Sequence, residues 1–112
     1  GGISRSAEGT GFFRETDPRA LRGRPACIGR QNIQRESLRE FIVMTKKLAF
    51  PGERAIFFIN NHHSFDFYAP DMPLRDEKSD LVTAMTTEEI ESHMQANNLK
   101  SIVIISPQRW AD

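Results

Sequence analysis

The chain has 112 residues, of which 38% are hydrophobic and 27% are charged, and its formal net charge at pH 7 is zero. This size and composition suit one ordinary globular domain with a single core. No apolar run approaches the roughly 20 residues of a membrane-spanning helix, and a single cysteine, Cys27, excludes an internal disulfide and a cysteine-based zinc site.

The first third of the chain is basic. Residues 1–35 hold seven arginines against three acidic residues, whereas residues 36–112 hold eight basic and twelve acidic residues. Because the first segment is rich in Gly and lacks a stable apolar period, we expect residues 1–35 to be irregular or flexible, with at most a short element at "GTGFFRET". Its arginines are not interleaved with aromatic residues in the manner of base-stacking surfaces, so we do not expect nucleic-acid binding.

Residues 36–112 are predicted to form an α/β domain. A stripe of residues spaced at three and four predicts a helix that ends before the turn at Pro51-Gly52, and the stripe comprises Leu38, Phe41, Ile42, Thr45 and Leu48. The next block, "AIFFI", is apolar on both faces, which is typical of a central strand in a parallel sheet covered by helices.

The second half of this domain repeats the alternation of strand and helix. "LVTAM" predicts a short strand, and "TTEEIESHMQANN" predicts a helix with Thr86 and Glu89 in capping-box spacing. "SIVIIS" is a further strand that is apolar on both faces and stops at Pro107. The order of elements therefore predicts a small three-layer α/β domain with a mainly parallel sheet.

A polar stretch follows the predicted strand "AIFFI". Residues that follow the carboxyl end of a parallel strand line the crevice in which such domains bind ligands, so we consider this stretch a candidate ligand-binding crevice. Its candidate residues are Asn60, Asn61, His62, His63, Ser64, Asp66 and Tyr68.

A purely structural role competes with each chemical one. Ser64 can cap a short helix at "SFDFYA", which Pro70 would end. A metal site is disfavoured because adjacent histidines on an extended chain point in opposite directions, and a Ser-His-Asp triad is normally assembled from separate loops. We therefore expect no metal and no cofactor here, and the structural role accounts for more of these residues than a catalytic one.

"NHHSFD" resembles the Asn-His-x-Ser-x-x-Asp block of glycerolipid acyltransferases. The resemblance implies that His62 would act as general base and that Asp66 would orient it. Three residues separate His62 from Asp66 here, where that family has four, and the family's downstream Phe-Pro-Glu-Gly block does not occur. An acyltransferase-like enzyme using His62 and Asp66 is therefore kept as an alternative.

A wider resemblance covers about seventy residues, from 36 to 106. The layout is similar to the soluble C-terminal segment of polytopic lipid-linked-sugar glycosyltransferases, the aminoarabinose transferase and protein mannosyltransferase-like group. The shared features are a helix, the turn Pro51-Gly52-Glu53, an apolar strand at residues 56–59, and a block made by Ser64, Phe67 and Tyr68.

This resemblance implies a soluble accessory domain without a catalytic site of its own. Its partner would be the membrane part of the same polypeptide, with a polyprenyl-phosphate sugar or a glycan acceptor bound nearby. The resemblance further implies that the domain lies on the periplasmic, or extracytoplasmic, face of the membrane. The second alternative is a small α/β domain that binds a ligand or another protein.

Overall fold

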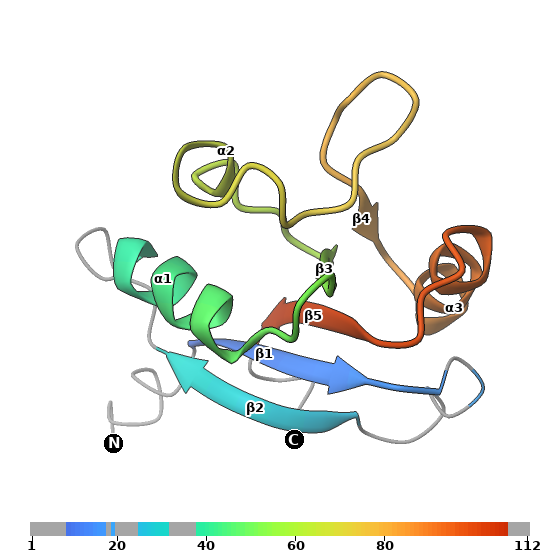
Figure 1. Cartoon of the computed structure of the whole chain (residues 1–112), viewed down its shortest axis with the longest axis horizontal. Helices are drawn as coiled ribbons and strands as arrows, with labels where there is room; N and C mark the ends of the chain where they lie inside the picture. Colours follow the sequence, from blue (N-terminus) through green and yellow to red (C-terminus); the bar gives the residue numbers. More distant parts are fainter. Residues whose placement is uncertain (1–8, 18, 20–24, 32–37, 108–112) are drawn as a thin grey trace, which may run out of the picture.

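The computed structural model describes residues 9–17, 19, 25–31 and 38–107. These residues form a five-stranded sheet with helices on both faces (Figure 1). The strands lie in the order β2-β1-β5-β3-β4, and their bounds are β1 (Thr10–Glu15), β2 (Ala26–Gln31), β3 (Arg54–Phe58), β4 (Thr83–Ala84) and β5 (Ile102–Pro107).

The α/β class is confirmed, but the sheet is mixed, so the expectation of a mainly parallel sheet was wrong. β3 runs parallel to β4 and β5, whereas β1 runs antiparallel to both β2 and β5. The difference arises in the segment expected to be irregular, because "GTGFFRET" provides an inner strand and "ACIGRQ" provides its outer neighbour. β1 is held there because Phe12 and Phe13, on alternate sides of the strand, are both buried in the core.

The predicted helices are present, at α1 (Leu38–Leu48), α2 (Phe65–Tyr68) and α3 (Thr87–Ala96). The capping residue of α3 is confirmed, since the Thr86 hydroxyl accepts a hydrogen bond of 3.2 Å from the Glu89 amide. No helix within the described residues is long and apolar enough to cross a membrane.

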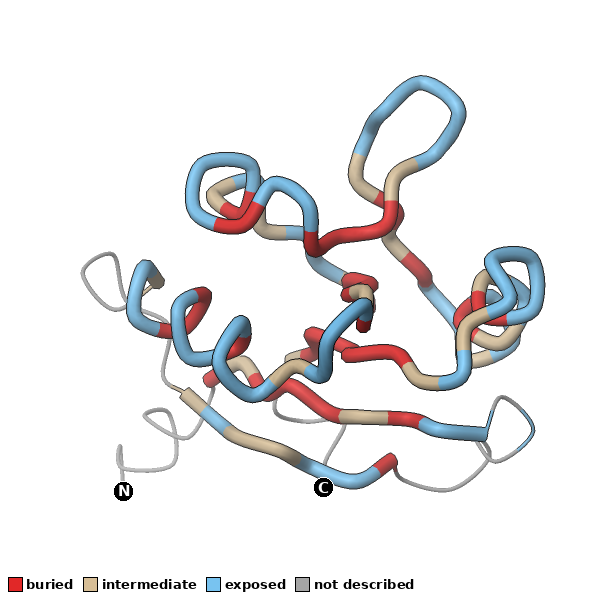
Figure 2. Tube along the Cα trace, viewed as in Figure 1, coloured by how far each residue is buried: buried red, intermediate tan, exposed pale blue. Residues whose placement is uncertain are grey.

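An apolar cluster packs between the sheet and the helices on each of its faces. The cluster on one face of the sheet contains Phe41 and Ile42 of α1 together with Phe65 of α2. The cluster on the other face contains Ile90 and Met94 of α3. The strands between these helices are buried on both sides, and Figure 2 shows this buried centre beneath the exposed outward sides of the helices. α1 and α2 therefore cover one face, and α3 covers the other.

Candidate functional site

The polar stretch leaves β3 at its carboxyl end through a sharp change of direction. Ile59 has a φ of +75°, a conformation that a β-branched residue adopts only under strain. Its amide still donates a hydrogen bond of 2.8 Å to the carbonyl oxygen of Ala84, which keeps this point attached to β4. Asn60 and Asn61 follow, and both are exposed. The stretch is thus anchored at its start and open to solvent immediately afterwards.

His62 and His63 lie in different environments. The ring of His62 is half-buried and packs edge-to-face on Phe57, with 6.0 Å between the ring centroids. Burial lowers the pKa of His62 below its usual value, because the charged imidazolium loses solvation there. His63 is exposed. The structure therefore gives His62 a packing role as a neutral ring at neutral pH.

The carboxylate of Asp66 is bound by Arg75. One guanidinium nitrogen of Arg75 lies 2.6 Å from an Asp66 oxygen and also donates to the carbonyl oxygen of Pro70 at 3.1 Å. The other terminal nitrogen donates to the carbonyl oxygen of Ser79 at 3.1 Å. No hydrogen bond within the described residues joins Asp66 to His62, so the pairing that a general base would need is not formed in this structure.

Ser64 occupies the N-terminal position of α2, as the sequence predicts, but its side chain makes no capping hydrogen bond. Its carbonyl oxygen instead accepts from the amides of Phe67 and Tyr68, at 3.0 and 3.3 Å. Tyr68 is 44% exposed and Phe67 is 85% exposed. The short helix therefore turns an aromatic surface outward, and only Phe65 of its four residues is buried.

The candidate residues share one loop and helix, but hydrogen bonds do not connect their side chains into a reactive group. In the described part of the chain, no set of three or more His, Cys, Asp or Glu residues is arranged to hold a metal ion. The side chains available at this surface are two exposed amides, an exposed imidazole and a phenol. Such groups can form hydrogen bonds with a ligand, and they do not form a nucleophile with its base.

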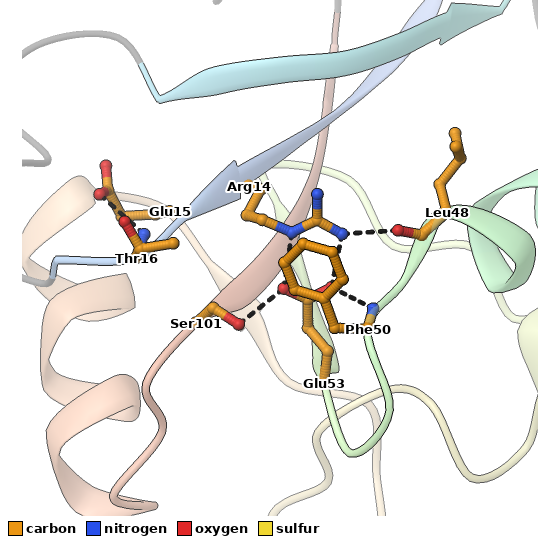
Figure 3. Close-up of polar contacts among 7 residues, drawn as sticks. All are labelled: Arg14, Glu15, Thr16, Leu48, Phe50, Glu53 and Ser101. Carbon is orange, nitrogen blue, oxygen red and sulfur yellow. Dashed lines mark hydrogen bonds and ion pairs between the residues drawn. The ribbon is translucent and has the colours of Figure 1, made fainter.

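A buried charged group elsewhere was not predicted from the sequence. The carboxylate of Glu53 accepts hydrogen bonds from the Phe50 amide at 3.0 Å and from the Ser101 hydroxyl at 2.7 Å, and it also binds Arg14 (Figure 3). Burial alone would raise the pKa of Glu53. The hydrogen bonds from Arg14, Phe50 and Ser101, together with the charge of Arg14, outweigh burial and lower that pKa.

A cleft of about 500 Å³ lies beside this group, between the turn after α1 and the segment that leaves α2. Lys46, Phe50, Arg54 and Pro70 are among the residues that line it. Arg54 donates one hydrogen bond, of 3.3 Å, to the carbonyl oxygen of Pro73, and its buried Nε has no partner. The sequence contained no motif that would have indicated this cleft.

Comparison of the chain with protein-family models, curated proteins and solved structures finds no match. Function is therefore inferred from the fold, from the loop after β3 and from the exposed surface. In the loop after β3, the carboxylate of Asp66 is paired with Arg75.

Proposed function

We propose that this chain is a non-catalytic domain of a membrane glycosyltransferase that uses a lipid-linked sugar. In this proposal the domain lies on the extracytoplasmic face and helps the membrane part of the same polypeptide to engage its acceptor or its polyprenyl-phosphate sugar donor. The observation that carries the proposal is the order of elements from Leu38 to Pro107. Helix, turn, apolar strand, short aromatic helix, strand, helix and strand follow one another as the resemblance implies.

The state of the loop after β3 supports a role without catalysis. A general base must be oriented by its partner, and the only carboxylate close to His62 in sequence, Asp66, is held by Arg75 instead. His62 itself packs on Phe57. The exposed amides, imidazole and phenol of this loop remain able to form hydrogen bonds with sugar hydroxyls or a phosphate.

The first test is an NMR titration of the chain with detergent micelles that contain a polyprenyl phosphate. Matched micelles contain the corresponding polyprenol without phosphate. We expect resonances of residues 60–68 to shift with the phosphate lipid and to remain unchanged with the alcohol. Shifts that do not depend on the phosphate, or that are absent in both cases, would contradict donor engagement.

The second test is an activity assay of the chain alone. We expect no transfer from a radiolabelled polyprenyl-phosphate sugar to any acceptor in the absence of a membrane part. Sugar transfer by the isolated chain would refute the accessory role. Acyl transfer from a thioester that disappears in His62→Ala would favour the acyltransferase alternative, since that alternative requires the His62 imidazole as base.

A further inference from the structure

The exposed large apolar side chains are concentrated on one face of the domain. Seven such side chains occur among the described residues, and six of them belong to α1, to the turn that follows it, or to α2. These six are Val43, Met44, Leu48, Phe50, Phe67 and Tyr68. Both helices cover the same face of the sheet (Figure 1), and we call the exposed side of these two helices and of the turn after α1 the α1/α2 face.

Phe67 is the most exposed member of this face. It lies two residues after the buried Phe65, about 200° around the helix, and therefore points away from the core. Its ring is 85% exposed, and Tyr68 next to it is 44% exposed. Monomeric proteins rarely leave several large apolar side chains exposed together unless that surface contacts a partner.

Three exposed cations accompany these apolar side chains on α1, namely Arg39, Lys46 and Lys47. No hydrogen bond or ion pair to another described residue involves any of the three side chains. Glu40 is the acidic residue of this helix, and the Asp66 carboxylate on α2 is already neutralised by Arg75. Asp71, which lines the same cleft as Lys46 and Phe50, is a second exposed acid beside Glu40. Three exposed cations thus stand against two carboxylates, and the α1/α2 face combines exposed apolar groups with a small excess of positive charge.

We propose that the α1/α2 face docks on the surface of a bilayer that contains anionic lipids. Aromatic and aliphatic side chains enter the boundary between headgroups and acyl chains, while lysine and arginine bind lipid phosphates from beside them. Among the described residues no carboxylate pairs with any of these three cations, so their charges are available to lipid phosphates. The inference rests on the proposed function for its setting at a membrane, and it specifies which face meets the lipid.

The experiment is co-sedimentation of the full chain with vesicles. One vesicle type contains phosphatidylglycerol and phosphatidylcholine in equal parts, and the other contains phosphatidylcholine alone. We expect binding to the anionic vesicles, weaker binding as NaCl is added, and little binding to the neutral ones. No binding of the wild-type chain to anionic vesicles would overturn the inference.

Substitutions test whether the α1/α2 face is the surface that binds. We expect Phe67→Gln to lower the partition coefficient about fivefold or more and the double change Lys46→Gln with Lys47→Gln to lower it about 25-fold. The matched controls are Met85→Gln and Lys100→Gln, which alter an exposed methionine and an exposed lysine outside α1 and α2. Equal binding by all the variants would overturn the assignment of the face.

Two further measurements separate the remaining outcomes. If sedimentation velocity shows a dimer that Phe67→Gln abolishes, and anionic vesicles do not bind, the face contacts a second copy of the chain and the inference fails. A chain that ignores phosphatidylglycerol vesicles but responds to polyprenyl phosphate in micelles keeps the proposed function and loses this docking face. A chain that binds vesicles through this face but does not respond to polyprenyl phosphate keeps the docking face and loses the proposed function.

Discussion

Arg14 and Glu53 form a bidentate ion pair across 39 residues of sequence. Nε of Arg14 lies 2.9 Å from one carboxylate oxygen of Glu53, and Nη2 lies 2.9 Å from the other (Figure 3). Only 1% of the Glu53 side chain is exposed, and 14% of the Arg14 side chain. Two parallel hydrogen bonds between opposite charges are among the strongest polar contacts in proteins, so this pair fixes the distance between β1 and the start of β3.

The two side chains of this pair also contact neighbouring segments of the chain. Nη2 of Arg14 donates to the carbonyl oxygen of Leu48 at 2.6 Å, which satisfies an orphan carbonyl at the end of α1. The guanidinium carbon lies 3.7 Å from the centre of the Phe50 ring, a cation–π contact. Ser101, just before β5, donates to the same carboxylate. One buried acid thereby connects β1, α1, β3 and β5.

Glu53→Gln is expected to destabilise the fold by about 2 kcal/mol, because the Arg14 guanidinium loses its charged partner while it remains mostly buried. The measurement is the free energy of unfolding from urea denaturation at pH 7. Asp66→Asn is the matched control, since it removes the ion pair with Arg75, whose members are 42% and 28% exposed. This control is expected to cost less than about 1 kcal/mol. Equal losses in both variants would show that the buried Arg14–Glu53 pair stabilises the fold no more than the exposed Arg75–Asp66 pair.

Acid should remove the contribution of Glu53. The pKa of Glu53 is lower in the folded chain than its usual value near 4.5, so the unfolded chain binds more protons as the pH falls through that range. The contribution is therefore complete above about pH 5 and is lost as the pH falls through the folded pKa. We expect the free energy of unfolding to fall more steeply in this range for the wild-type chain than for Glu53→Gln. Parallel curves would show that this carboxylate does not titrate as stated.

His62 should affect stability at higher pH. Burial holds its folded pKa below 6.5, so between that lower value and 6.5 the unfolded chain carries the extra proton. Stability should therefore decline as the pH is lowered through this window. His62→Phe retains an aromatic ring beside Phe57 and should remove that decline while leaving stability at pH 7.5 within about 1 kcal/mol. The free energies of unfolding of the two chains are compared by urea denaturation from pH 7.5 to 5.5. The same decline in both chains would show that His62 does not cause it.

The elements after residue 36 could be predicted because their patterns are local. The apolar stripe that includes Phe41 and Ile42 is a property of one helix, and a run such as "SIVIIS" shows by itself that both faces of a strand are buried. A short element was expected at "GTGFFRET", where β1 lies, but its position as an inner antiparallel strand of the sheet could not be predicted in this way. Its Arg14 and Glu15 look like surface residues, and the burial of Arg14 depends on Glu53, which is far away in sequence.

In the loop after β3, too, local features could be predicted from the sequence, and contacts set by the tertiary structure could not. Its position at the carboxyl end of β3 follows from the strand pattern and was predicted. The partner of Asp66 was not, because Arg75 lies in a charged loop whose path depends on the pairing of Ala55 with Pro73 and of Arg75 with Leu81. The acyltransferase resemblance suggested His62 as the partner of Asp66, although the spacing between them is one residue short, whereas the tertiary path of the loop provides Arg75.

Thr86→Ala should weaken the start of α3. Its hydroxyl accepts a hydrogen bond from the Glu89 amide, and the Glu89 carboxylate accepts one from the Met85 amide at 2.6 Å. The substitution removes the first of these hydrogen bonds and weakens the second, because Glu89 is no longer held in place. We expect a loss of about 1 kcal/mol in the free energy of unfolding. Ser92→Ala, an exposed position of the same helix, is the control and should leave stability unchanged or raise it by about 0.5 kcal/mol. A larger loss at Ser92 would contradict the capping explanation.

Gly29→Ala tests why a glycine stands in β2. A Cβ at this position would overlap Cζ of Phe12 and lie 2.7 Å from its Cε2. Phe12 is fully buried and packs on Phe41 with 5.3 Å between the ring centroids, so its ring has little freedom to move away. We expect Gly29→Ala to destabilise the fold by about 1–3 kcal/mol through overpacking.

The exposed neighbour provides the control for this substitution. Arg30→Ala, on the same strand, should change the free energy of unfolding by less than about 0.5 kcal/mol. The α protons of Gly29 should also resonate upfield in the wild-type chain, because the Phe12 ring lies against that residue. If Gly29→Ala is as stable as the wild-type chain and no upfield shift is seen, Phe12 does not cover β2. The edge strand would then be held by its backbone pairing with β1 alone.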